Sequence, residues 1–136
     1  MTEPPSGAPP PVTATLGDGE SLDLRALALE ICTRYRAEFP DEEGRYGDAG
    51  MAWCIHDNQH LLSWAVTEAN GIGGFRPQLE WLAVVLEARE FPLDRLARNL
   101  ELAAAVLEDD AVPPGPAAVL ADGAGFVRLR RTFLAK

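Results

Sequence analysis

The chain has 136 residues, enough for one compact domain, and 47% of them are hydrophobic, so a packed core can form. Acidic residues outnumber basic ones by 21 to 12, and the formal net charge of −9 predicts no binding to nucleic acid or to an anionic membrane. Two cysteines are too few for a disulfide framework, and no apolar run is suited to spanning a bilayer or directing secretion. We therefore expect a cytoplasmic protein.

Residues 1–19 are rich in proline and glycine and hold five of the eleven prolines. A segment of this composition buries too little apolar surface to offset the entropy of ordering the chain. The sequence therefore predicts a disordered tail over 1–19 and a single helical domain over 20–136. The tail could also present a proline motif to a partner.

Two helices are predicted in the first half of the domain. Ser21 can cap the first, which carries apolar residues at helical spacing and ends near Phe39, because a proline follows. The acidic segment 41–50 contains three glycines and predicts a loop. The second helix then covers about 49–70, where an Asn-Gly pair stops it.

Two further helices are predicted at about 75–90 and 93–108, each with an apolar stripe at helical spacing. The segment between the second and third helices, GIGGF at 71–75, has the glycine content of a phosphate-binding loop. A dinucleotide-binding loop would follow a strand, however, and here a helix precedes it. We interpret this segment as a flexible turn.

The C-terminal part follows a break at VPPGP, residues 112–116. It is predicted to form one or two short helices interrupted at Gly123 and Gly125, and 126–134 fits a strand as well. Together the predicted elements indicate an all-α protein, either a bundle of four to five helices or an orthogonal helical domain.

The second helix divides into two faces on a helical wheel. One face is apolar, and the other carries Trp53, His56, His60 and Trp64, with Asp57 beside them. In one interpretation this helix is central and buried on both sides, with its tryptophans beneath the first and fourth helices. In the other, this second face binds a protein partner, a flat cofactor such as a tetrapyrrole, or a metal.

A metal at His56 and His60 would match the spacing of the H-E-x-x-H zinc motif, with Asp57 in place of the glutamate. Zinc catalysis needs a third protein ligand, which a carboxylate would have to supply because the chain has only two histidines. No other catalytic motif is evident. We therefore expect no enzyme and no cofactor, but a regulatory module that self-associates or docks a protein partner. The alternative is a small-ligand, tetrapyrrole or metal sensor that uses this face.

The C-terminal segment 123–136 is basic and apolar and contains no acid. The residues that we expect to dock it are Arg128, Arg130, Arg131 and Phe133. The docking surface is predicted to be acidic protein, either this chain near 38–48 or 108–110, or a partner such as a second copy. Exposed ion pairs contribute about 0–1 kcal/mol each, so the apolar residues must supply most of the stabilisation.

A run with the pattern F-x-x-x-L-x-W-L-x-x-V-L-x-A-R extends from Phe75 to Arg89, and F-P-L-D-x-L and N-L-E-L segments follow it. Through these segments, residues 55–107 resemble the helical domain that precedes cobalamin-binding domains in bacterial regulatory and light-sensing-type proteins. The resemblance implies an all-helical sensory or regulatory module. It does not imply cobalamin binding, because the ligating D-x-H-x-x-G motif and the α/β domain that holds the corrin do not occur in this sequence.

Overall fold

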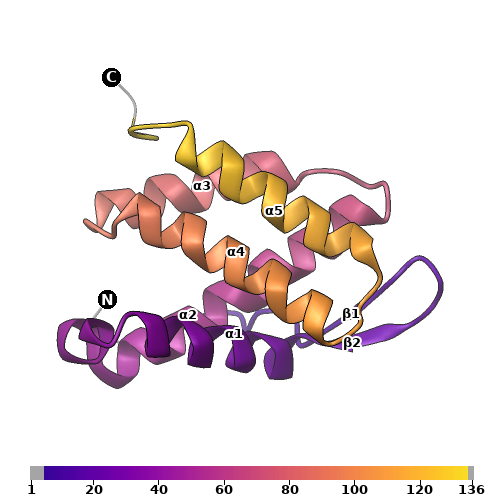
Figure 1. Ribbon diagram of the computed structural model, residues 1–136, viewed down its shortest axis with the longest axis horizontal. Coiled ribbons are helices and arrows are strands. Elements are labelled where there is room, and N and C mark those ends of the chain that lie inside the picture. The colour runs from indigo at the N-terminus through magenta and orange to yellow at the C-terminus, as the bar shows by residue number, and fades with distance from the viewer. Residues whose placement is uncertain (1–4, 135–136) are drawn as a thin grey trace.

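The computed structural model describes residues 5–134, in which a small β-hairpin precedes five helices (Figure 1). The hairpin pairs β1 (Thr13–Thr15) with β2 (Ser21–Asp23) in antiparallel register. The helices are α1 (Leu24–Glu38), α2 (Asp41–Ala69), α3 (Phe75–Ala88), α4 (Leu93–Asp109) and α5 (Pro114–Arg128). The predicted all-α fold is confirmed apart from this hairpin. Within the described part of the chain, no helix combines the length and apolarity needed to cross a membrane.

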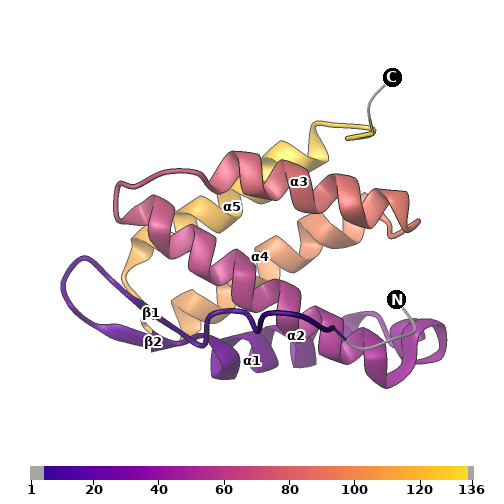
Figure 2. The same cartoon turned by 180° about the vertical axis from the view of Figure 1, so that it is seen from behind.

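One hydrophobic core joins all five helices. α4 packs along α5 and α1, while α2 packs on α1 and α5 from the opposite side. The largest fully buried side chains include Leu24, Ile31, Leu62, Leu79, Leu100 and Leu120. Burying each such side chain stabilises the fold by about 1.5–3 kcal/mol. In the view of Figure 2, α2 and α3 lie in front of α4 and α5.

The chain joins the domain earlier than the sequence predicted. Residues 1–4 lie outside the described range, so the predicted tail can be compared only from residue 5. β1 lies inside that predicted tail, Leu16 beyond it is buried, and Gln59 of α2 donates a hydrogen bond to the Pro11 carbonyl at 3.0 Å. The prediction of disorder is therefore wrong from Pro11 onward. The sequence did not reveal the hairpin, because strands of three residues are too short to show a period of alternating apolar residues.

The hairpin also changes how α1 begins. Ser21, the predicted cap, belongs to β2. Asp23 caps the helix instead, because its carboxylate accepts a hydrogen bond from the Ala26 N–H at 3.0 Å. Aspartate and serine are about equally favourable as caps. The helix therefore begins at Leu24, after Asp23, and it ends near Phe39 as the sequence predicted.

Segment 41–50, predicted as a loop, is helical and forms the start of α2. The helix breaks at Gly47, where φ is 61° and ψ is −152°, a conformation open essentially to glycine alone. The first turn is held by tertiary contacts: the buried Glu42 accepts hydrogen bonds from the Tyr35 hydroxyl at 3.0 Å and from Arg95 at 2.7 Å. No local pattern reveals these contacts, which is why the prediction was wrong.

α5 runs unbroken through Gly123 and Gly125, so the predicted interruption and the strand alternative for 126–134 are both wrong. A Cβ at Gly123 would lie 2.9 Å from the Phe75 ring and 3.1 Å from Leu79. Glycine therefore allows α5 to approach α3 closely. A Cβ at Gly125 would meet no other atom, so this glycine makes no close contact. The residues on either side of it, Ala124 and Val127, are buried, and their packing keeps this part of the chain helical.

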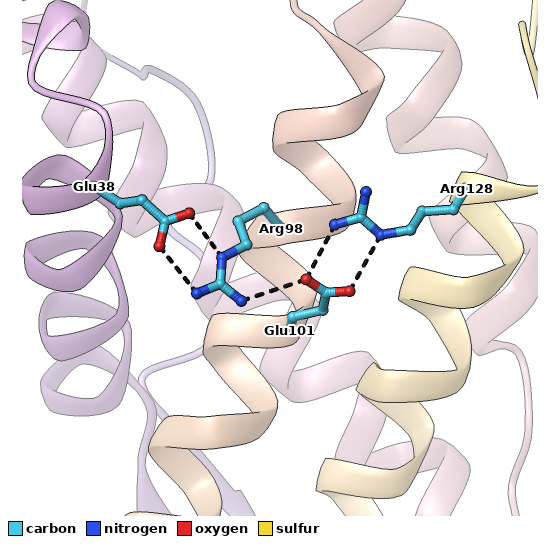
Figure 3. A network of polar contacts seen from close by, with 4 residues as sticks. All are labelled: Glu38, Arg98, Glu101 and Arg128. Atoms are coloured by element: carbon cyan, nitrogen blue, oxygen red, sulfur yellow. Dashed lines mark hydrogen bonds and ion pairs between the residues drawn. The ribbon is translucent and has the colours of Figure 1, made fainter.

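A polar network on the surface joins α1, α4 and α5 (Figure 3). Arg98 donates to both carboxylate oxygens of Glu38, at 2.7 and 2.9 Å, and Arg128 donates to both oxygens of Glu101, at 3.1 and 3.0 Å. Arg98 also reaches Glu101 at 3.4 Å, which links the two pairs. The arginines lower the pKa of both glutamates. Each side chain is more than a third exposed, so each ion pair contributes only about 0–1 kcal/mol to the stability of the fold. The main effect of the network is to fix the positions of the three helices relative to one another.

Candidate functional site

A groove of about 610 Å³ lies between α2 and α3, which diverge from the turn that joins them (Figure 2). The α2 wall consists of Trp53, His56, Asp57, His60 and Trp64. The α3 side consists of Gln78, Trp81, Leu82, Val85, Leu86 and Arg89. All four residues of the face predicted from the sequence therefore line one cavity.

The rings of the α2 wall form a continuous row. The ring centroids of Trp53 and His56 are 5.3 Å apart, those of His56 and His60 are 4.9 Å apart, and those of His60 and Trp64 are 5.5 Å apart. The first two pairs meet edge to face and the third is stacked. Residues three or four apart share one side of a helix, and ring pairs in this distance range attract one another. The row is therefore a mutually supported aromatic surface.

The groove face of α2 is half-buried, and the described residues that line the groove with it belong to α3 and not to α1 or α4. The interpretation of α2 as a helix buried on both sides is therefore wrong. Its buried residues are Ile55, Asn58, Gln59, Leu61, Leu62, Ala65 and Val66, together with Glu42 and Gly50 near its start. Across the groove, the Trp81 side chain of α3 is 60% exposed. α2 thus has one face in the core and one that meets solvent beside α3.

The ionisable groups of the α2 wall are arranged as neighbours. His56 Nδ1 lies 3.2 Å from the Asp57 carboxylate and donates to it when that nitrogen carries a proton. Burial and the nearby His56 lower the pKa of His60. His60 is therefore neutral at pH 7, with one ring nitrogen as a donor and the other as an acceptor.

The predicted metal chemistry at His56 and His60 requires a third protein ligand. Within residues 5–134, no group of three or more His, Cys, Asp or Glu side chains is arranged to hold a metal ion. Asp57, the nearest carboxylate in the sequence, is hydrogen-bonded to His56. The described residues therefore do not supply the ligand set of a zinc enzyme.

A smaller chamber of about 50 Å³ lies next to the groove and shares Asp57, Leu82 and Leu86 with it. At this chamber the buried Asn58 and Asn99 exchange two side-chain hydrogen bonds, of 3.1 and 2.8 Å. Within the described residues, every buried side-chain nitrogen or oxygen has a hydrogen-bond partner. The chamber is large enough for a water molecule and is part of the polar packing between α2 and α4.

The sequence-based prediction missed the α3 side of the groove. Gln78, Trp81, Val85 and Arg89 follow one another at intervals of three or four residues, so they share one side of a helix. That spacing was visible in the sequence. It did not reveal that this side of α3 would stand opposite the tryptophans of α2, because no local pattern fixes how two helices pair.

The C-terminal segment contacts its own chain through Phe133, which is buried. The ring centroids of Phe133 and Phe126 are 5.6 Å apart, and the Arg130 guanidinium lies 4.3 Å from the centroid of the Phe133 ring. Glu87 of α3 accepts hydrogen bonds from the Phe133 N–H at 2.7 Å and from the Thr132 hydroxyl at 2.5 Å. The segment is therefore held by one buried ring and one carboxylate.

The acids that meet this segment differ from those predicted. Arg128 pairs with Glu101, and Arg130 lies 3.9 Å from Glu80, so the described part of the segment, up to residue 134, uses acids of α3 and α4 rather than those at 38–48 or 108–110. Arg131 is exposed, and no carboxylate among the described residues pairs with it. The predicted surfaces were wrong because they were chosen for charge density in the sequence, whereas docking depends on which acids lie beside the end of α5.

No family model matches the chain, and no curated protein or solved structure matches it significantly. The resemblance of residues 55–107 to the helical domain that precedes cobalamin-binding domains therefore stays a prediction. The function has to be inferred from the geometry of the groove.

Proposed function

We propose that this protein is a non-enzymatic regulatory module of the cytoplasm that binds a small planar ligand in the groove between α2 and α3. The observation that carries the proposal is that all three tryptophans of the chain, Trp53, Trp64 and Trp81, line this one groove. Sites for small molecules typically measure about 300–1,000 Å³ and are mostly apolar or aromatic, with a few polar groups. The volume of about 610 Å³ and the lining of this groove fit that description.

Packing alone does not explain the gathered tryptophans. α3 is already anchored in the core by Phe75, Leu79 and Leu86, which are buried. Trp81 leaves 60% of its side chain exposed and adds little to that anchoring. Large aromatic residues left half-exposed around a cavity are suited to contact with a planar apolar molecule.

The polar groups of the groove favour binding over catalysis. They are two imidazoles, one carboxylate, one amide and one guanidinium, and no serine, cysteine or threonine occurs among the described residues that line it. The groove therefore lacks the side chains that commonly act as nucleophiles beside a histidine. Cys32 and Cys54 are free, in keeping with the reducing conditions of the cytoplasm.

Binding of a neutral fluorescent probe, N-phenyl-1-naphthylamine, tests the proposal. We expect saturable binding by the wild-type protein, and Trp64→Ala should weaken it about tenfold, because one aromatic contact contributes about 0.5–1.5 kcal/mol beyond burial. Leu129→Ala is the control, since Leu129 is exposed and does not line the groove. Circular dichroism checks that each variant is folded. Equal binding by the Trp64 variant and the wild type, or no saturable binding by either, would overturn the proposal.

Self-association through α3 is a second candidate, favoured by a separate observation. The outer side of α3 carries an exposed apolar stripe at heptad-like spacing: Pro77, Trp81, Val84 and Ala88. In an antiparallel pair of α3 helices centred between Val84 and Val85, the large Trp81 faces the small Ala88 of the second copy. The same register places Glu80 opposite Arg89 of the second copy. The two α3 surfaces would therefore be complementary in side-chain size and in charge.

Light scattering over a range of protein concentrations tests this second candidate. A single pair of short helices buries less than the ~1,200 Å² of a standard interface, so we expect a weak dimer that forms only at high concentration. Trp81→Ser should shift the equilibrium toward the monomer, whereas Leu129→Ser should not. Glu80→Arg and Arg89→Glu should each weaken the dimer, and together they should restore it. A wild-type protein that stays monomeric at every concentration would exclude self-association.

A further inference from the structure

The charged groups at the groove differ in whether they are already neutralised. Asp57 is hydrogen-bonded to the neighbouring His56 at 3.2 Å. Arg89, by contrast, has no carboxylate partner among residues 5–134, although eight other arginines there form at least one ion pair. Arg25 and Arg131 also lack such a partner among the described residues, but of these three arginines Arg89 is the one that lines the groove.

Arg89 is positioned over the aromatic surface of the groove. Its guanidinium carbon lies 5.4 Å from the centroid of the Trp53 ring, within the range of a cation–π contact. A guanidinium carries five N–H donors in one plane, and two of them can bind both oxygens of an acid group. A planar molecule against the tryptophans can therefore place an acid group at Arg89.

The acidic residues close to Arg89 in sequence have other surroundings. Glu87 accepts two hydrogen bonds from the C-terminal segment, from Thr132 and Phe133, so its carboxylate is engaged on that side of α3. Glu90 is exposed in the turn after α3, where its φ of 62° ends the helix. Neither residue lines the groove. Arg89 is therefore the one charged group of the groove that lacks a carboxylate or imidazole partner within the described chain.

We infer that the ligand of the groove is a planar aromatic anion, such as an aromatic carboxylate or sulfonate, whose acid group pairs with Arg89 while its rings contact Trp53, Trp64 and Trp81. This inference rests on the proposed function of the groove and adds the charge of the ligand to it. The uncharged His60 between the aromatic rings supplies a hydrogen-bond donor or acceptor without selecting against an anion. Arg89 is accordingly the residue that selects for charge.

Two fluorescent probes with the same ring system separate the effect of charge from that of shape. N-phenyl-1-naphthylamine is neutral, and 8-anilinonaphthalene-1-sulfonate carries the same rings with one sulfonate. We expect the wild-type protein to bind the sulfonate at least about fivefold more tightly than the neutral probe, since an ion pair of about 1 kcal/mol gives this ratio. The preference should shrink as salt concentration rises, because Arg89 is exposed to the screening ions.

Arg89→Gln removes the charge and keeps a polar side chain. We expect it to abolish the preference for the sulfonate and to change the binding of the neutral probe less than about twofold, since only the charge has been removed. Arg131→Gln is the matched control, because Arg131 is also exposed and unpaired among the described residues but lies outside the groove. Arg89→Lys should keep part of the preference, because the charge remains and the two-pronged geometry is lost.

The outcomes distinguish the two proposals. If both probes bind equally, or if the preference survives Arg89→Gln, the inference about the anion is overturned while the groove remains a binding site. If neither probe binds, the proposed function fails and the inference fails with it. If Arg131→Gln lowers the preference as much as Arg89→Gln does, the sulfonate responds to overall charge and not to Arg89, which also overturns the inference.

Discussion

The two faces of α2 have different environments within one helix. On the core face, Leu62 and Ala65 are buried and Asn58 is hydrogen-bonded to Asn99. On the groove face, the aromatic and imidazole rings are half-buried, and among the described residues α3 forms the opposite side of the groove. The comparison shows that the core face accounts for the packing of the bundle, so the composition of the groove face has another explanation.

The charged residues repeat this contrast. On the side formed by α1, α4 and α5, Arg98 and Arg128 each bind a carboxylate through two hydrogen bonds (Figure 3). At the groove, Arg89 contacts an indole and has no carboxylate partner in the described chain. One surface is internally neutralised, and the other keeps a cation available to a ligand.

The largest expected effect comes from removing a core side chain, compared with one at the groove. Leu100→Ala should lower the free energy of unfolding by about 2–5 kcal/mol, because Leu100 is fully buried and the change leaves a cavity. Trp81→Ala should lower it by less than about 1 kcal/mol, since its side chain is mostly exposed. Urea unfolding followed by circular dichroism measures both. Equal losses would mean that the groove face is part of the structural core.

The C-terminal segment offers a second comparison, between an apolar and a charged contact. Phe133→Ala should destabilise the fold by about 3 kcal/mol, because this buried ring packs against Phe126. Arg131→Ala should change stability by less than about 0.5 kcal/mol, because Arg131 is exposed and unpaired among the described residues. Thermal midpoints across salt concentrations measure both effects. A larger, salt-sensitive loss for Arg131→Ala would identify the segment as an electrostatic arm instead.

Two glycines of α5 should respond to alanine in opposite directions. Gly123→Ala should destabilise by about 1–3 kcal/mol, because the new methyl group would crowd the Phe75 ring. Gly125→Ala should stabilise by about 0.5–1 kcal/mol, because nothing obstructs it and alanine favours a helix. Denaturant midpoints compare the two variants. A stabilising Gly123→Ala would show that α3 and α5 can separate without cost.

The smallest expected effect is a pH dependence at the groove. The pKa of His60 is lowered from 6.5 by burial and by His56, so the unfolded chain takes up this proton at a higher pH than the folded chain does. Stability should therefore be complete above about pH 6.5 and should fall as the pH drops below it. His60→Gln should reduce this loss between pH 7.5 and pH 5, as measured by urea unfolding. The glutamates with lowered pKa values act below this range and do not confuse the comparison.

Local patterns determined most of the helices from the sequence. The predicted end of α1 and both ends of α3 and α4 lie within two residues of those observed, because apolar spacing and nearby prolines act over a few residues. The same reasoning placed Trp53, His56, His60 and Trp64 on one side of α2. Amphipathic spacing is a property of the helix itself, so it can be derived before any neighbour is known.

Only the tertiary structure decided what stands opposite each face. The hairpin near Leu16, the helical turn held through Glu42 and the close approach at Gly123 all depend on residues distant in the sequence. The groove itself exists because α3 brings Trp81 and Arg89 toward the aromatic face of α2, whereas α1 and α5 pack on α2 elsewhere. A helical wheel shows that a helix has two faces, but burial is decided by how several helices pack together, since that packing determines which surface is removed from water.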